Sequence, residues 1–176
     1  MEIIDLVFLI LAVLGIIIPT VAYLLWVKNT VNKNKYPTSY SGTYGIWYSY
    51  EYRQHIFTAW TAFQTVLLLP ALVHYSTNIY EILMGVFALT SLCFVGLFPT
   101  SVSKEVTKLH CIFAKVCAID AIVWLFLKGH YTTTLCLLIC GFIWSRLFQR
   151  KYETLIMEFM AFLSAYIGII LCSIGV

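Results

Sequence analysis

Long apolar stretches, separated by short polar connections, run through almost the whole chain. A helix needs roughly 20 mainly apolar residues to cross a hydrocarbon core about 30 Å thick. On this basis we predict six membrane spans, at residues 6–27, 56–73, 82–98, 109–127, 131–145 and 154–176. The pattern therefore predicts an all-α, polytopic membrane bundle that forms a single transmembrane domain over residues 1–176.

The composition agrees with this reading. Of the 176 residues, 61% are hydrophobic and only 11% are charged, whereas a soluble domain carries about 25% charged residues. The first apolar stretch follows the acidic residues Glu2 and Asp5 and is longer than the apolar region of a secretory signal. We therefore expect it to stay in the protein as a membrane span.

The basic residues of the connections predict the orientation, because short cytoplasmic loops are enriched in Lys and Arg. The second and fourth connections contain only Lys128. The first, third and fifth contain Lys28, Lys33, Lys35, Arg53, Lys104, Lys108, Arg146, Arg150 and Lys151. Both termini are therefore predicted to lie outside. Because these residues form no continuous basic stripe and the net charge is only +3, we expect no nucleic-acid partner.

The cysteines and histidines do not follow the spacing of a metal or haem site. All six cysteines lie inside apolar segments, and the pair Cys136 and Cys140 has no second pair beside it. His55 and His74 are 19 residues apart, which is about 28 Å along a helix and places them at opposite membrane boundaries. We therefore expect no cofactor, and we interpret the cysteines as packing residues.

Lys115, Asp120 and Glu158 are ionisable residues within predicted spans. Such residues are costly in lipid and usually face the bundle interior or water. Lys115 and Asp120 are five residues apart, a spacing that does not stack them on one helix as three or four would. Glu158 is a possible partner for Lys115. A structural ion pair and a path through a small transporter or channel subunit both remain open.

A metal-dependent membrane lipid hydrolase is a further alternative. Glu51 and His55 are four residues apart before the second span, and His110 begins the fourth span on the same predicted side. Two histidines and a carboxylate can hold a catalytic metal. The chain has no nucleophile elbow, phosphate-binding glycine loop or zinc-protease motif. Enzymatic activity stays open, with a non-enzymatic role favoured.

The first connection, residues 28–55, is rich in aromatic side chains. It contains Tyr36, Tyr40, Tyr44, Trp47, Tyr48, Tyr50 and Tyr52. Tyr and Trp favour the headgroup layer of a membrane, where the ring is in apolar surroundings and the polar atom stays hydrated. The segment is therefore expected to lie at the interface, either as an aromatic belt or as a cap over a lipid or ligand cavity.

Several short motifs between Pro37 and Phe126 occur in an order that resembles a group of bacterial six-span membrane proteins, distantly similar to the DRAM, Frag and Sfk families. The motifs are Pro37-Thr38-Ser39-Tyr40-Ser41, Arg53 before Ile56-Phe57, Gly85-Val86-Phe87-Ala88-Leu89, Gly96-Leu97-Phe98-Pro99-Thr100, and Leu109-His110 before Ile112-Phe113-Ala114. The most specific part is Phe98-Pro99-Thr100 followed by Leu109-His110.

The resemblance implies a bacterial inner-membrane protein with a lipid-facing or membrane-homeostasis role. It implies that Arg53 and His110 form a polar pair beside the first connection, where Ser39 and Tyr40 are further candidates for ligand binding. A lipid headgroup at the cytoplasmic interface is the expected ligand, because the arginine side chain matches phosphate geometry. Four glycines also offer close helix approach in a homo-oligomer or a larger assembly: Gly85, Gly96, Gly141 and Gly168.

Overall fold

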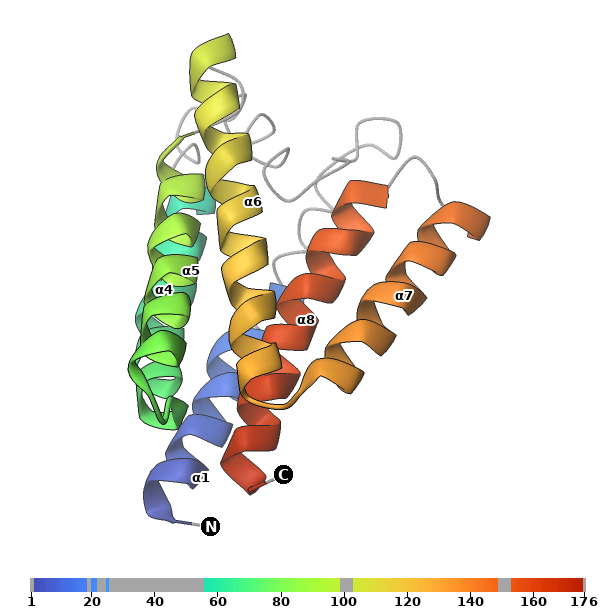
Figure 1. Ribbon diagram of the computed structural model, residues 1–176. Helices are drawn as coiled ribbons and strands as arrows, with labels where there is room; N and C mark the ends of the chain where they lie inside the picture. Colours follow the sequence, from blue (N-terminus) through green and yellow to red (C-terminus); the bar gives the residue numbers. More distant parts are fainter. Residues whose placement is uncertain are drawn as a thin grey trace.

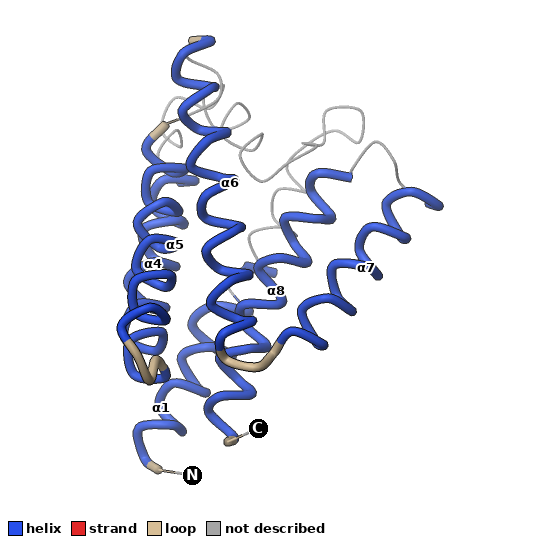
Figure 2. The backbone as a smooth tube through the Cα atoms, in the orientation of Figure 1, coloured by secondary structure: helices blue, strands red, loops and turns tan. Residues whose placement is uncertain are grey.

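The computed structural model describes residues 2–18, 20–21, 25, 56–98, 103–148 and 153–175. Within these ranges the chain forms helices and no strand (Figure 2), so the predicted all-α fold is confirmed. The elements are α1 (Ile3–Ile10), the π-helical segment η1 (Leu11–Ile17), α4 (Ile56–Tyr75), α5 (Ile79–Leu97), α6 (Lys104–Leu127), α7 (Tyr131–Phe148) and α8 (Glu153–Ile174).

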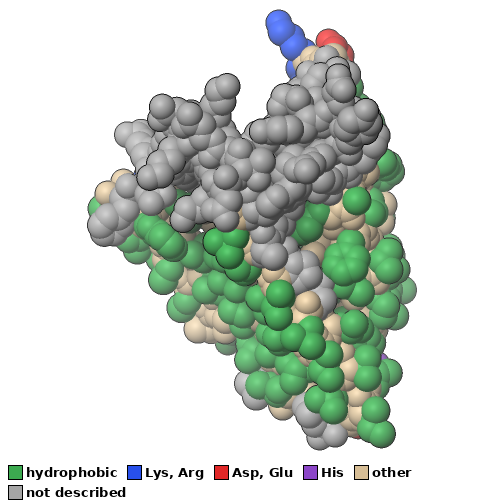
Figure 3. Space-filling model, turned by 180° about the vertical axis from the view of Figure 1, so that it is seen from behind, with side chains coloured by type: hydrophobic (Ala, Val, Ile, Leu, Met, Phe, Trp, Pro, Cys, Tyr) green, Lys and Arg blue, Asp and Glu red, His purple; other side chains and the backbone are tan. Residues whose placement is uncertain are grey.

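Four of these helices are long and apolar enough to cross a membrane, by length and composition. They are Phe57–Tyr75, Ile79–Leu97, Lys104–Leu127 and Ile156–Ile174, whereas α1 with η1 and α7 are shorter apolar helices. Hydrophobic side chains cover the described part of the face seen in Figure 3, and charged ones are visible at one end. The chain is an integral membrane protein, and the count of six spans stays a prediction.

Two helices, α5 and α6, begin several residues earlier than the apolar pattern predicted. α5 begins at Ile79 instead of residue 82, because the Asn78 side chain accepts hydrogen bonds from the N–H groups of Tyr80 and Glu81. α6 begins at Lys104 instead of residue 109, where Ser103 caps the first turn. Hydropathy alone assigns such polar first turns to the connections, although their backbone is already helical.

The helices form a bundle around α6 and α8 (Figure 1). α4 and α5 make an antiparallel hairpin that packs beside α6, while α1 lies along α8. α7 packs mainly against α8 and diverges from α6 at its C-terminal end. The buried cluster joins α1, α4, α5, α6 and α8 through Phe8, Leu68, Leu72, Leu89, Leu92, Trp124, Leu125, Tyr166 and Ile169.

The hairpin is closely packed where α5 ends. The Thr58 hydroxyl on α4 donates a 2.7 Å hydrogen bond to the carbonyl oxygen of Gly96 on α5. A Cβ atom added to Gly96 would overlap the hydroxyl of Thr61, and the Cβ of Thr61 would be 3.0 Å away. Glycine is therefore required for this approach of the two backbones, as in other membrane helix pairs.

We predict that Gly96→Ala lowers the free energy of unfolding by about 1–3 kcal/mol through overpacking. Gly85→Ala is the matched control, because a Cβ there would meet Leu72 at an ordinary 3.4 Å. Both changes gain the same helix propensity, so the difference between them reports packing. The measurement is thermal unfolding in detergent. Equal midpoints for the two variants would contradict the close contact.

Candidate functional site

His110 lies in the second turn of α6 and is 3% exposed. Its Nδ1 lies 2.8 Å from the carbonyl oxygen of Phe98 and 3.1 Å from that of Val95. Because carbonyl oxygens only accept, Nδ1 carries the proton and donates. These carbonyls belong to the end of α5, where a helix leaves its last acceptors unsatisfied. His110 therefore joins α6 to the end of α5, and its Nε2 is left for another contact.

A cavity of about 140 Å³ lies between α4, α5, α6 and α8, and His110 is part of its wall. Alanine occupies five positions of this wall on α6 and α8. They are Ala114, Ala118, Ala121, Ala161 and Ala165. These small side chains leave space between helices that larger residues would fill. The cavity therefore follows from the sequence, because alanines form a stripe on two facing helices.

His110 and Glu158, the imidazole and the carboxyl group of the cavity wall, lie toward one end. His110 is six residues from the beginning of α6 and Glu158 five residues from the beginning of α8, and both helices begin at the same end of the bundle (Figure 1). The wall continues to Trp124 at the other end of α6. The fourteen residues from His110 to Trp124 correspond to about 21 Å of helix. The cavity is therefore a narrow, apolar space with one polar end.

The five other predicted ligand residues all fall outside the described part of the chain. These residues are Arg53, Ser39 and Tyr40 of the lipid site, and Glu51 and His55 of the metal alternative. Among the described residues, no group of three His, Cys, Asp or Glu side chains is placed to hold a metal ion. Of the candidate ligands, the structure thus places His110, at the polar end of the cavity.

The three intramembrane ionisable residues are not brought together. Glu158 lines the cavity, but Lys115 is exposed on the outside of α6 and Asp120 is half-buried outside the cavity wall. Within the described residues, no ion pair joins Lys115 to Glu158. A transport path through all three residues therefore cannot follow this cavity.

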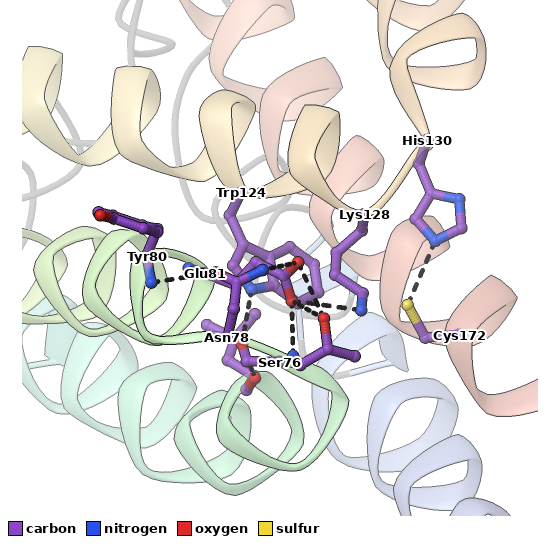
Figure 4. A network of polar contacts seen from close by, with 10 residues as sticks. Ser76, Asn78, Tyr80, Glu81, Trp124, Lys128, His130 and Cys172 are labelled. Carbon is purple, nitrogen blue, oxygen red and sulfur yellow. Dashed lines mark hydrogen bonds and ion pairs between the residues drawn. The ribbon is translucent and has the colours of Figure 1, made fainter.

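A polar network closes the opposite end of the bundle (Figure 4), and sequence reasoning missed it. The Glu81 carboxylate accepts 2.7 Å hydrogen bonds from the Thr77 N–H and the Asn78 amide, and it lies 3.4 Å from Lys128 Nζ. The indole N–H of Trp124 donates to the Ser76 hydroxyl at 3.2 Å. These contacts connect the α4–α5 turn to the end of α6. The spacing Asn78-x-x-Glu81, typical of a helix start, was the available signal.

His130, in the α6–α7 turn beside this network, contacts the Cys172 thiol on α8 through Nε2 at 3.2 Å. Burial lowers the pKa of His130 below its usual value, and the nearby charge of Lys128 acts in the same direction. A neutral imidazole is the form that suits this contact. The interaction holds the turn against α8.

A second missed group lies in the interior. Gln64 on α4 is fully buried, and its Oε1 accepts a 2.8 Å hydrogen bond from the Tyr166 hydroxyl of α8. The Thr20 hydroxyl lies 3.5 Å from the same tyrosine oxygen. The three side chains connect α4 and α8 with Thr20, which follows η1 in the sequence. A glutamine inside an apolar span was the sequence signal for this contact.

Comparison of the chain with protein-family models, with curated proteins and with solved structures finds no match. The resemblance to the DRAM, Frag and Sfk families therefore stays a prediction.

We predict that His110→Ala lowers the free energy of unfolding by about 1–3 kcal/mol, since it leaves the carbonyl groups of Val95 and Phe98 without this donor. His110→Asn should recover most of this loss, because the asparagine amide nitrogen lies close to the position of Nδ1. Lys108→Ala, at an exposed position of the same helix, is the control. Thermal unfolding in detergent measures all three. An alanine variant as stable as the control would exclude the structural role of His110.

Proposed function

We propose that the protein binds a membrane lipid, with one hydrocarbon chain in the cavity and the headgroup beside His110 and Glu158. One observation carries the proposal: an apolar cavity inside the bundle has the imidazole of His110 and the carboxyl group of Glu158 at the same end. An amphiphile has the same distribution of polarity. A metabolite that is polar over its whole length would leave most of its hydrogen-bonding groups unpaired in this wall.

The size of the cavity supports a chain rather than a whole lipid. Its volume of about 140 Å³ is close to that of engineered apolar cavities of about 150 Å³ that take up one small hydrocarbon. It is below the roughly 300–1,000 Å³ of pockets for drug-sized ligands. Because the wall extends over about 20 Å of helix, the space is narrow. A segment of a single chain, with the rest of the lipid and its headgroup outside the cavity, fits these dimensions.

The polar end offers chemistry for a headgroup. His110 Nε2 accepts a hydrogen bond when the ring is neutral and donates one when it is protonated. α4, α6 and α8 all begin at this end, and helix N-termini favour phosphate. Arg53 precedes α4 by three residues in the sequence, and we propose that it joins the site with Ser39 and Tyr40. An anionic phospholipid of the cytoplasmic leaflet is the proposed ligand.

Native mass spectrometry of gently extracted protein tests the proposal. We expect a retained phospholipid in the wild type, and its loss in Ala121→Leu, which fills the cavity. Ala62→Leu is the matched control, because Ala62 is exposed on the outside of α4. His110→Asn should also lose the lipid, because it keeps the donor to α5 but removes Nε2. Arg53→Ala tests the predicted partner.

The outcomes separate the parts of the proposal. Lipid retained by Ala121→Leu at the wild-type level would overturn the role of the cavity. If Ala121→Leu loses the lipid but His110→Asn and Arg53→Ala keep it, the role of the cavity in binding a chain is supported and the proposed headgroup site is wrong. Lipid lost equally from Ala62→Leu would indicate annular lipid on the outside of the bundle and would contradict the proposal.

A further inference from the structure

The outward face of α6 carries an apolar seam. Six residues recur along it at alternating spacings of three and four, and each is between 37% and 59% exposed: Leu109, Ile112, Val116, Ile119, Val123 and Phe126. This alternation is the a and d pattern of a heptad repeat, which typically packs one helix against another in a coiled coil. At one end of the seam, Phe126 contacts the ring of Tyr131 at the start of α7. No helix in the described part of the chain covers the rest of the seam.

The seam lies opposite the face that α6 turns to its own bundle. His110, Ala114, Cys117, Ala121 and Trp124, which line the cavity, occupy heptad positions b and f. Positions b, c and f lie on the far side of a helix from a and d. α6 therefore has two apolar faces, one used inside the bundle and one exposed to its surroundings.

Two opposite charges flank this seam near the middle of the helix. In the same register, Lys115 occupies position g and Asp120 occupies position e. Five residues correspond to about 140° around one helix, so the two side chains point to different sides and do not meet. Neither has an ion pair among the described residues. Both charges lie at membrane depth, where lipid solvates them poorly.

The spacing of five is the one that pairs charges between two parallel helices. In a parallel coiled coil, a g residue of one helix faces the e residue that lies five positions further along its partner, and such ion pairs set partner and orientation. Lys115 of one copy would thus meet Asp120 of a second copy. Two copies inserted in the same direction are related by a two-fold axis along the membrane normal. The pair of Lys115 with Asp120 therefore forms twice.

We propose that α6 forms the interface of a parallel homodimer, with the seam from Leu109 to Phe126 at its centre and two Lys115–Asp120 ion pairs at its edges. Lipid also covers an apolar seam, but it offers no partner for a flanking pair of opposite charges. The proposal is independent of the cavity, because the interface uses the opposite face of α6.

Disulfide cross-linking in native membranes tests the packing. Ile119→Cys places a thiol at a d position, where two-fold partners face each other. Ile139→Cys on α7 is the matched control, since the two isoleucines are 59% and 55% exposed. The exposed cysteines Cys111, Cys136 and Cys140 are changed to serine in both variants. We expect mild oxidation to convert most of the Ile119→Cys protein to dimer and little of the control. Equal yields would overturn the proposal.

Charge reversal tests the pairing in the same Ile119→Cys background. Lys115→Asp places two acidic residues against each other, and Asp120→Lys two basic ones, so each should lose most of the cross-linked dimer. The double variant, Lys115→Asp with Asp120→Lys, restores opposite charges and should restore the dimer. Single variants that dimerise like the parent, or a double variant that stays monomeric while keeping its thermal unfolding midpoint, would overturn the assigned pairs.

Discussion

In a hydrocarbon surrounding, each polar group of a protein must find its partner within the protein, because lipid offers none. The contacts that hold this bundle together follow from that constraint. His110 donates to the carbonyls at the end of α5, Thr58 donates to Gly96, and the Tyr166 hydroxyl donates to Gln64. Apolar packing contributes shape, but it gains little from burial when the surroundings are equally apolar. The few polar contacts therefore determine which helices are neighbours.

The same constraint explains why a cavity can persist between these helices. α5 is held to α6 near the polar end by His110, and Glu81 with Lys128 joins the α4–α5 turn to α6 at the other end. Because α6 is held to the α4–α5 hairpin at both ends, a simple shift of one helix toward the other cannot fill the space that the small alanine side chains leave. A hydrocarbon chain is the natural filler, since it restores the dispersion contacts that the wall lacks.

The helical segments could be predicted from hydropathy, because helices exposed to lipid are long stretches of mainly apolar residues. The first turns of α5 and α6 could not, since their caps are made by polar residues such as Asn78 and Ser103. His110 was predicted as a ligand residue by motif, but its hydrogen bonds to α5 depend on tertiary contact. The contacts of Glu81 with Lys128 and of Gln64 with Tyr166 were missed because each partner is distant in the sequence, and spacing along one chain does not report that distance.

Lys115 and Asp120 show how one spacing can be interpreted in two ways. Within a single helix, a separation of five residues argues against an ion pair, and a partner such as Glu158 was the natural expectation. The structure places Glu158 at the cavity and Lys115 on the outside. Between two parallel helices, the same separation is complementary. In the two proposals taken together, α6 has one face for a lipid chain and the opposite face for a second copy. A ligand that displaces α6 would therefore act directly on the dimer contact.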